Sequence, residues 1–140
     1  MTEKLYILVR TDMDSMTPGR IAAQAAHAAN MFVGYAEVLK QDLKDNEEPD
    51  DPFIVYFDNW QKQTSDFFGT TIVLNGGTEQ DIEQILIELE DRYITGRVID
   101  PEYPIRDGDT VHILKNVMTC GYAFHFGEGK DDGLKDWELL

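Results

Sequence analysis

Cysteine and long apolar runs are nearly absent from this chain. Its single cysteine, Cys120, excludes an internal disulfide. No apolar stretch is long enough to cross a membrane, because Gln24, His27 and Asn30 interrupt the alanine-rich segment. No cationic signal sequence precedes the first apolar run. We therefore expect a protein of the reducing cytoplasm that makes no contact with a membrane.

The sequence also lacks the marks of several enzyme classes. It contains no Walker loop, no Gly-x-Ser-x-Gly nucleophile elbow and no dinucleotide-binding glycine pattern. Its three histidines, His27, His112 and His125, show no paired metal-ligand spacing. A mixed site of His112 and His125 with Cys120 is a minor alternative. We expect neither a metal ion nor an organic cofactor.

Basic residues are scarce as well. Twelve Lys and Arg residues stand against 27 Asp and Glu residues, so the formal net charge is −15. A general nucleic-acid binder is expected to be basic, since neutralising phosphates supplies most of its affinity. However, residues 1–41 are neutral overall, and the acidic residues concentrate in 42–51, 79–91 and 128–138. These segments are either solvated faces turned away from a ligand or an adaptation to a salty or crowded host.

What is present fits one α/β domain over residues 1–140. A chain of 140 residues with 42% hydrophobic residues can bury a real core. Apolar runs alternate with helical periodicities, which predicts a three-layer α/β/α fold with a small mixed sheet of four to five strands and helices on both faces. The expected strands are 4–10, 70–74, 96–100, 110–115 and 119–126, and the expected helices are 18–44 and a second one that begins at 78.

Turn-forming residues set the expected boundaries in the first half. The acidic run 45–52 predicts an exposed loop, and 75–77 predicts a turn. Thr78 with Asp81 forms the pattern of a capping box, which starts a helix. The segment between these features stays open: 53–57 fits a short strand or an apolar turn, and 60–68 fits irregular or helical structure.

Prolines and glycines set the expected boundaries in the second half. Pro101 and Pro104 are expected to stop the third strand. Asp107-Gly108 predicts a tight turn, and the last two strands would then meet in a hairpin around Lys115-Asn116. The acidic tail, 127–140, is expected to dock loosely through Trp137 and its two terminal leucines.

The most informative segment is 10–30, which begins an alanine-rich helix at Pro18. Proline at the first helical position loses no hydrogen bond, and the threonine before it is a good N-cap. Arg20, Gln24 and His27 follow at steps of four and three, so they share one stripe of the helix. His27 fits either a core histidine or a group that positions a substrate. A cation and an amide in line at a helix start indicate a site.

This segment resembles the N-terminal signature of the type 2 peptidyl-tRNA hydrolases. The shared pattern is Val-Arg-Thr-Asp, a short loop with Met, and Gly-Arg-x-Ala-Ala-Gln-x-Ala-His-Ala, with Arg20 where the family usually has lysine. Weaker similarity extends through Trp60, 69–74 and 98–100. The resemblance implies a small mixed sheet sandwiched by helices, a peptidyl-tRNA substrate and, by family tendency, a homodimer.

The resemblance places the catalytic carboxylate at Asp100. In open α/β sheets ligands gather beyond the carboxyl ends of strands, where Asp100 and Arg20 are both expected. The alternative for Asp100 is a turn-forming residue before proline. The family continues from this aspartate with Ala-Gly-x-Thr, whereas this chain has Asp-Pro-Glu-Tyr-Pro, so Pro104 replaces that threonine. A second family threonine corresponds to Thr110, or to Thr119 if 106–117 is an inserted strand; Thr119, directly before Cys-Gly-Tyr-Ala-Phe, fits slightly better.

By this resemblance the reaction is hydrolysis of the ester between a peptide and the 3′ ribose of tRNA. Asp100 would orient or deprotonate a water, and Thr119 or Thr110 would help to hold it. Arg20 would stabilise the developing oxyanion or the terminal phosphate. Gln24 would hold a ribose hydroxyl or orient Asp100. The alternative is a binding or regulatory module on the same fold, which the changed Asp-Pro-Glu-Tyr-Pro element and the net acidity favour.

Overall fold

Four strands form one mixed sheet in the order β2-β1-β4-β3. The computed structural model describes residues 3–126 and 133–140. Strand β1 is parallel to β2 and antiparallel to β4, and β4 is antiparallel to β3. The elements in chain order are β1 (Lys4–Arg10), α1 (Pro18–Asp45), α2 (Pro52–Gln61), β2 (Thr71–Gly77), α3 (Glu79–Leu89), β3 (Tyr93–Asp107) and β4 (Thr110–His125).

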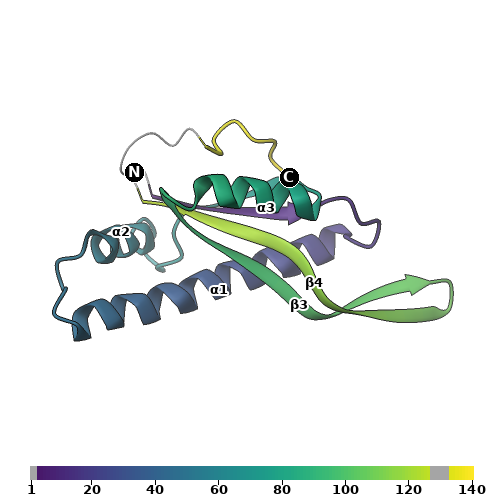
Figure 1. Ribbon diagram of the computed structural model, residues 1–140, viewed down its shortest axis with the longest axis horizontal. Coiled ribbons are helices and arrows are strands. Elements are labelled where there is room, and N and C mark those ends of the chain that lie inside the picture. The colour runs from purple at the N-terminus through teal and green to yellow at the C-terminus, as the bar shows by residue number, and fades with distance from the viewer. Residues whose placement is uncertain (1–2, 127–132) are drawn as a thin grey trace.

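Helices cover both faces of this sheet, and the predicted α/β/α fold class is confirmed (Figure 1). Alternate residues of a strand point to opposite faces. One face of β1 therefore packs against α1 and α2, and the other face packs against α3. The first core layer includes Leu5, Ile7, Val9, Phe32, Phe57 and Trp60. The second includes Tyr6, Leu8, Leu74, Ile82, Leu86 and Ala123.

Helices α1 and α3 begin where the sequence predicts. Pro18 occupies the first turn of α1, and the buried residues of this helix recur every four positions, so a narrow stripe faces the sheet. At the start of α3 the Thr78 hydroxyl accepts the Asp81 N–H at 3.1 Å. The Asp81 carboxylate accepts the Thr78 N–H at 3.0 Å, which completes the predicted capping box.

Between α1 and β2 the chain forms a helix, so both alternatives for 53–57 are wrong. Asp51 caps α2 by accepting the Phe53 N–H at 2.9 Å, and Pro52 fills the first turn, where its missing N–H costs nothing. The helix ends at Gln61 and irregular structure follows, in agreement with the prediction for 60–68. Residues 46–50 are exposed.

The glycines after Asn75 do not form the predicted turn, because β2 continues to Gly77. A Cβ on Gly76 would lie 2.8 Å from Ile82 and 2.9 Å from the Val9 carbonyl oxygen. Gly76 therefore permits the close approach of α3 and β1 instead of reversing the chain. The reversal comes only after Gly77, which has a φ of 75°.

Neither proline stops β3, which runs on to Asp107, so that prediction is wrong. β3 is an edge strand, and edge strands tolerate residues that cannot donate to the ladder. The predicted turn at Asp107-Gly108 is confirmed, with a φ of 60° at Gly108. The predicted hairpin around Lys115-Asn116 is wrong, since β4 is continuous and Asn116 merely takes a φ of 55°, which asparagine tolerates.

The ends of β3 and β4 consequently form a two-stranded arm, residues 101–117, that projects past the helices (Figure 1). Residues 110–116 of β4 are all exposed, whereas residues 118–125 are all buried. We call the rest of the described chain the body. The junction between the two regions falls at Asp100 on β3 and at Val117 on β4, which pair with each other.

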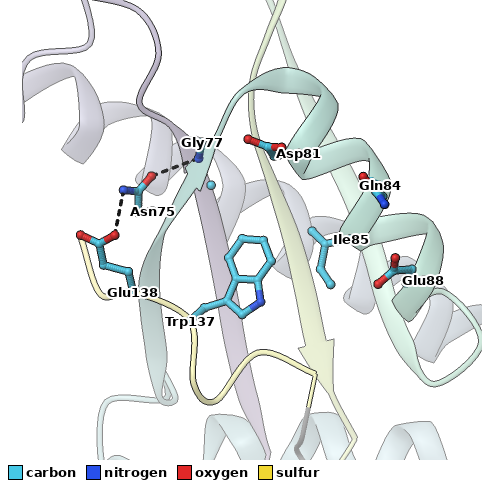
Figure 2. Close-up of a pocket in the computed structure, with 9 residues that line it drawn as sticks. Asn75, Gly77, Asp81, Gln84, Ile85, Glu88, Trp137 and Glu138 are labelled. Carbon is cyan, nitrogen blue, oxygen red and sulfur yellow. Dashed lines mark hydrogen bonds between the residues drawn. The ribbon is translucent and has the colours of Figure 1, made fainter.

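The described part of the tail packs along the outer edge of β2. The Asn75 N–H donates to the Glu138 carbonyl at 2.9 Å, and the Leu140 N–H donates to the Val73 carbonyl at 3.1 Å. Leu134 is fully buried, whereas Leu139 is 70% exposed. A cavity of about 580 Å³ lies between the tail and α3, with Trp137 and carboxylates on its walls (Figure 2). Within the described ranges no helix is both long and apolar enough to span a bilayer.

Candidate active site

Three predicted side chains meet where α1 packs against β3 and β4. The Gln24 amide nitrogen donates to Oδ2 of Asp100 at 2.9 Å, and its amide oxygen accepts the Thr119 hydroxyl at 2.6 Å. Gln24 is 5% exposed and Thr119 is fully buried. An amide has a donor at one end and an acceptor at the other, so Gln24 holds both neighbours at once. The structure thus brings Gln24, Asp100 and Thr119 together.

A β-bulge turns Thr119 toward this group. Val98 pairs with Cys120 and Ile99 pairs with Met118, so Thr119 is an extra residue without a partner on β3. Met118 packs into the layer beneath α3, whereas Cys120 packs into the layer beneath α1. In a regular strand Thr119 and its neighbour Cys120 would point to opposite faces, because neighbours alternate. The bulge shifts this alternation, and the Thr119 hydroxyl therefore reaches Gln24.

Both oxygens of the Asp100 carboxylate are held. Oδ2 accepts from Gln24, and Oδ1 accepts the Glu102 N–H at 3.0 Å, a local turn contact of aspartate. Asp100 is partly exposed, and it borders a cavity of about 210 Å³ whose other walls include His27 and Pro101. The carboxylate is therefore fixed in direction and still open to a small molecule.

Arg20 lies on the same side of α1 but contacts the arm. Its Nη1 donates to the Pro104 carbonyl, and its guanidinium carbon lies 5.3 Å from the centre of the Tyr103 ring. This is a cation–π geometry. Among the ion pairs of the described residues there is none between Arg20 and Asp100. Arg20 keeps further N–H donors beyond the one bonded to Pro104, because guanidinium carries five.

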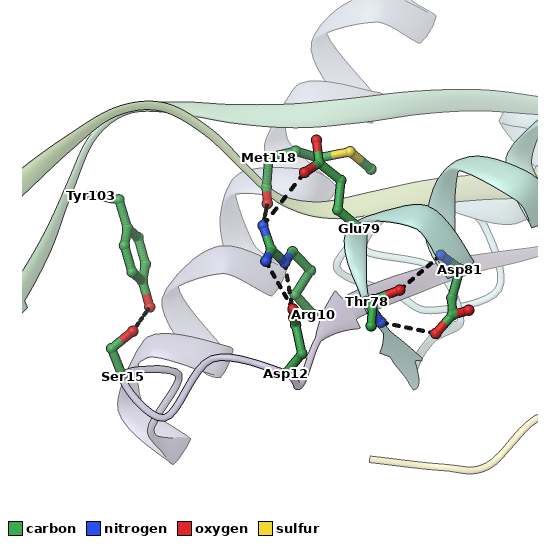
Figure 3. A network of polar contacts seen from close by, with 8 residues as sticks. All are labelled: Arg10, Asp12, Ser15, Thr78, Glu79, Asp81, Tyr103 and Met118. Atoms are coloured by element: carbon green, nitrogen blue, oxygen red, sulfur yellow. Dashed lines mark hydrogen bonds and ion pairs between the residues drawn. The ribbon is translucent and has the colours of Figure 1, made fainter.

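Sequence reasoning missed Tyr103, which joins the arm to the loop after β1. Its ring is 1% exposed, and its hydroxyl lies 3.0 Å from the Ser15 hydroxyl (Figure 3). Met16 supplies a weaker sulfur contact at 3.9 Å. A buried tyrosine between two prolines has no local pattern that marks it, since the arm that carries it was itself not predicted.

The other predicted residues take separate positions. Thr110 pairs with Asp107 at the tip of the arm and is exposed. Thr119 lies nine residues further along β4, which corresponds to about 30 Å at a rise of about 3.3 Å per residue. His27 is exposed on α1, so its interpretation as a core histidine is wrong, and it borders the cavity beside Asp100.

Arg10 ends β1 beside the bulge. It donates to both carboxylate oxygens of Asp12 at 3.0 and 2.9 Å, and to the Met118 carbonyl at 3.1 Å (Figure 3). Glu79 lies 3.8 Å away. The bond from Arg10 holds the pKa of the Asp12 carboxyl below its ordinary value and, with burial opposing, raises the pKa of Arg10 itself. Sequence reasoning assigned Arg10 no role of its own.

Cys120 lies close to the site without being reactive. Burial raises the pKa of its thiol to about 12, because the thiolate would lose its hydration. The thiol donates to the Gln24 carbonyl at 3.4 Å. No group of three or more His, Cys, Asp or Glu side chains in the described ranges is arranged to hold a metal ion. His112 lies on the exposed arm, whereas Cys120 and His125 lie in the body.

Comparison with known proteins identifies the family. No curated protein sequence matches the chain. The family described as peptidyl-tRNA hydrolase PTH2 matches residues 3–107, three quarters of the chain, a range that holds Arg20, Gln24 and Asp100. Thr119 lies beyond the matched range. Because the match covers well over half of the sequence, this chain belongs to the PTH2 peptidyl-tRNA hydrolase family.

Proposed function

We propose that this chain hydrolyses the ester bond of peptidyl-tRNA, releasing the peptide and free tRNA. The observation that supports this most directly is the Thr119–Gln24–Asp100 chain of hydrogen bonds beside an open cavity. It presents a carboxylate in a fixed direction, backed by a buried amide and a buried hydroxyl. Family membership supplies the substrate, and the geometry supplies the groups for an attack by water.

In the proposed mechanism Asp100 is the general base. Water attacks the ester carbonyl carbon and Asp100 takes its proton; the ribose 3′ oxygen then leaves with the electrons of the ester bond and receives that proton from Asp100. No covalent intermediate is needed, and the neutral, buried Cys120 thiol does not serve as a nucleophile. Gln24 orients Asp100, and Thr119 fixes Gln24, so both act through the carboxylate.

Arg20 supplies positive charge toward the substrate. Its guanidinium can donate to a tetrahedral oxyanion or to the terminal phosphate of the tRNA, and two parallel donors suit either oxygen group better than a lysine ammonium does. The bond to the Pro104 carbonyl holds the side chain on the arm side of α1. Pro104, whose carbonyl accepts this bond, is the residue that replaces the family's threonine.

A hydrolysis assay with matched variants tests the proposal. We expect the parent protein to release an N-blocked amino acid from N-blocked aminoacyl-tRNA. Asp100→Asn should lower kcat by about 10²- to 10⁴-fold, the usual contribution of a general base. Arg20→Ala should lower kcat/KM by roughly 10²- to 10³-fold. Asp107→Asn and Arg106→Ala, which remove the same charges from the arm, are the controls.

The turnover of the parent protein tests the function, and the turnover of the two variants tests the site. No turnover by the parent protein would contradict the hydrolase, and would favour a binding or regulatory module, the function that Pro104 in place of a threonine supports. In that case retention of N-blocked aminoacyl-tRNA on the immobilised protein measures binding directly. Equal turnover by the parent and both site variants would keep the hydrolase and discard the site.

A further inference from the structure

The bulge that orients Thr119 needs a support that the sheet itself does not provide. Pairing between β4 and β1 ends at Cys120, which lies opposite Val9. No residue of β1 pairs with Met118, the residue just before the bulge. A buried carbonyl without a donor costs about 1–3 kcal/mol, so the peptide after Met118 requires another partner on this side.

Arg10 supplies that partner. It is the last residue of β1, and its Nη1 donates to the Met118 carbonyl at 3.1 Å (Figure 3). Its side chain lies on the α3 face, because Leu5, Ile7 and Val9 occupy the α1 face. The guanidinium therefore holds the bulge from the face opposite Gln24 and Asp100.

Arg10 is itself fixed on its remaining sides. Asp12 receives two of its N–H groups, a fork geometry that sets the plane of the guanidinium, and Glu79 adds a weaker ion pair. The Arg10 side chain is only 14% exposed. Its donors face protein oxygens instead of solvent, so the group is suited to holding the backbone and not to binding a phosphate.

We propose that Arg10 is a positioning residue for the hydrolytic site: by holding the Met118 carbonyl it keeps the bulge in place, and so directs the Thr119 hydroxyl to Gln24 and, through Gln24, orients Asp100. This inference rests on the function proposed above. A shift of about 1 Å in a catalytic group can cost about 10²-fold in rate. Loss of the Arg10 contact should therefore lower kcat and leave substrate binding nearly unchanged.

The test compares the parent with Arg10→Gln and Arg10→Lys. Arg97→Gln is the matched control, since Arg97 is also a strand arginine paired with a carboxylate of α3, Glu83, and its ion pair does not reach Gln24, Asp100 or Thr119. Three quantities are measured on the full chain: kcat and KM with N-blocked aminoacyl-tRNA, the midpoint of thermal unfolding, and the NMR chemical shifts of the Gln24 side-chain amide protons.

We expect Arg10→Gln to lower kcat roughly 10- to 100-fold, to change KM by less than about twofold and to move the Gln24 amide signals. Arg10→Lys should fall between Arg10→Gln and the parent, because an ammonium can reach the carbonyl but cannot grip Asp12 with two donors. Arg97→Gln should behave as the parent in kcat and in the Gln24 signals.

Two outcomes would overturn the proposal. A raised KM with unchanged kcat would show that Arg10 binds substrate, and unchanged kcat with unmoved Gln24 signals would show that it is merely structural. If Arg10→Gln does not fold, Arg10→Lys is judged by the same criteria. If the parent does not hydrolyse the substrate, the proposed function fails by itself. The Gln24 signals then still decide the positioning role, because their movement supports it and their constancy contradicts it.

Discussion

The body and the arm share the strands β3 and β4, yet they are held in different ways. In the body β4 lies between two other strands and under helices on both faces, so residues 118–125 are all buried. In the arm the same strand has one neighbour and no cover, and residues 110–116 are all exposed. Asp100 and Thr119 lie at the boundary. The comparison indicates that the site uses the last firmly packed residues before the chain becomes exposed.

This boundary explains how a site can be both rigid and open. Gln24 and Thr119 are buried in the core, while Asp100 is partly exposed and borders a cavity of about 210 Å³. Arg20 connects the two regions, because it lies on α1 of the body and contacts Tyr103 and Pro104 of the arm.

The largest contrast is expected in stability. Phe32 is fully buried between the rings of Phe57, Trp60 and Phe124. Phe32→Ala should lower the free energy of unfolding by about 3–5 kcal/mol, because it leaves a cavity among large rings. Ile113→Ala on the arm should cost less than about 1 kcal/mol, since Ile113 is 48% exposed. Denaturant unfolding measures both. Similar losses for the two variants would mean that the arm is part of the packed core in solution.

A smaller contrast is expected in activity, and it decides between the two threonines. Thr119→Val keeps the shape but removes the hydroxyl that Gln24 accepts, and should lower kcat about 10²-fold. Thr119→Ser should recover most of the rate. Thr110→Val should leave kcat within about twofold of the parent, because Thr110 lies at the tip of the arm. If Thr110→Val lowered kcat as much as Thr119→Val does, the position of Thr119 at the boundary between body and arm would not explain its effect on activity.

The smallest contrast concerns pH and a single ion pair. Arg10 lowers the pKa of Asp12, so this carboxylate adds stability above its unfolded pKa, and that stability is lost as the pH falls through the folded value. At pH 7 Asp12→Asn should cost less than about 1 kcal/mol, because Asp12 is 32% exposed and solvent screens the pair. The difference from the parent should shrink as the pH falls through the lowered pKa of Asp12, and vanish once Asp12 is protonated in the folded protein. Asp109→Asn on the arm is the control, and a pH-independent cost of Asp12→Asn would contradict the ion-pair explanation.

Local chemistry made the body largely predictable from the sequence. The start of α1 at Pro18 and the capping box of Thr78 with Asp81 depend on neighbouring residues alone, and both are found. The stripe of Arg20, Gln24 and His27 follows from helical spacing. Helical spacing alone did not predict that Gln24 lies beside Asp100, because residues 76 positions apart share no local pattern. That prediction depended on the family resemblance.

The arm was not predictable in the same way. Pro101 and Pro104 stop a central strand but not an edge strand, and strand order is a property of the whole sheet. Asn116 forms turns as readily as it takes a left-handed position inside a strand. The bulge at Thr119 depends on the pairing of β4 with β3. The sequence therefore left Thr110 and Thr119 as alternatives, with Thr119 slightly favoured, and the geometry places only Thr119 beside Gln24.

β3 and β4 form a hairpin, in which β3 ends at Asp107 and β4 begins at Thr110. This connection affects how the site assembles during folding. Positions 100 and 119 are 19 residues apart along the chain, whereas Gln24 and Asp100 are 76 apart. The ratio is fourfold, and each doubling of a loop adds about 0.6 kcal/mol of closure entropy, so joining Asp100 to Thr119 costs about 1.2 kcal/mol less than joining Asp100 to Gln24. The two strands can thus bring the carboxylate and the hydroxyl together by a local event, and α1 then adds the amide that links them.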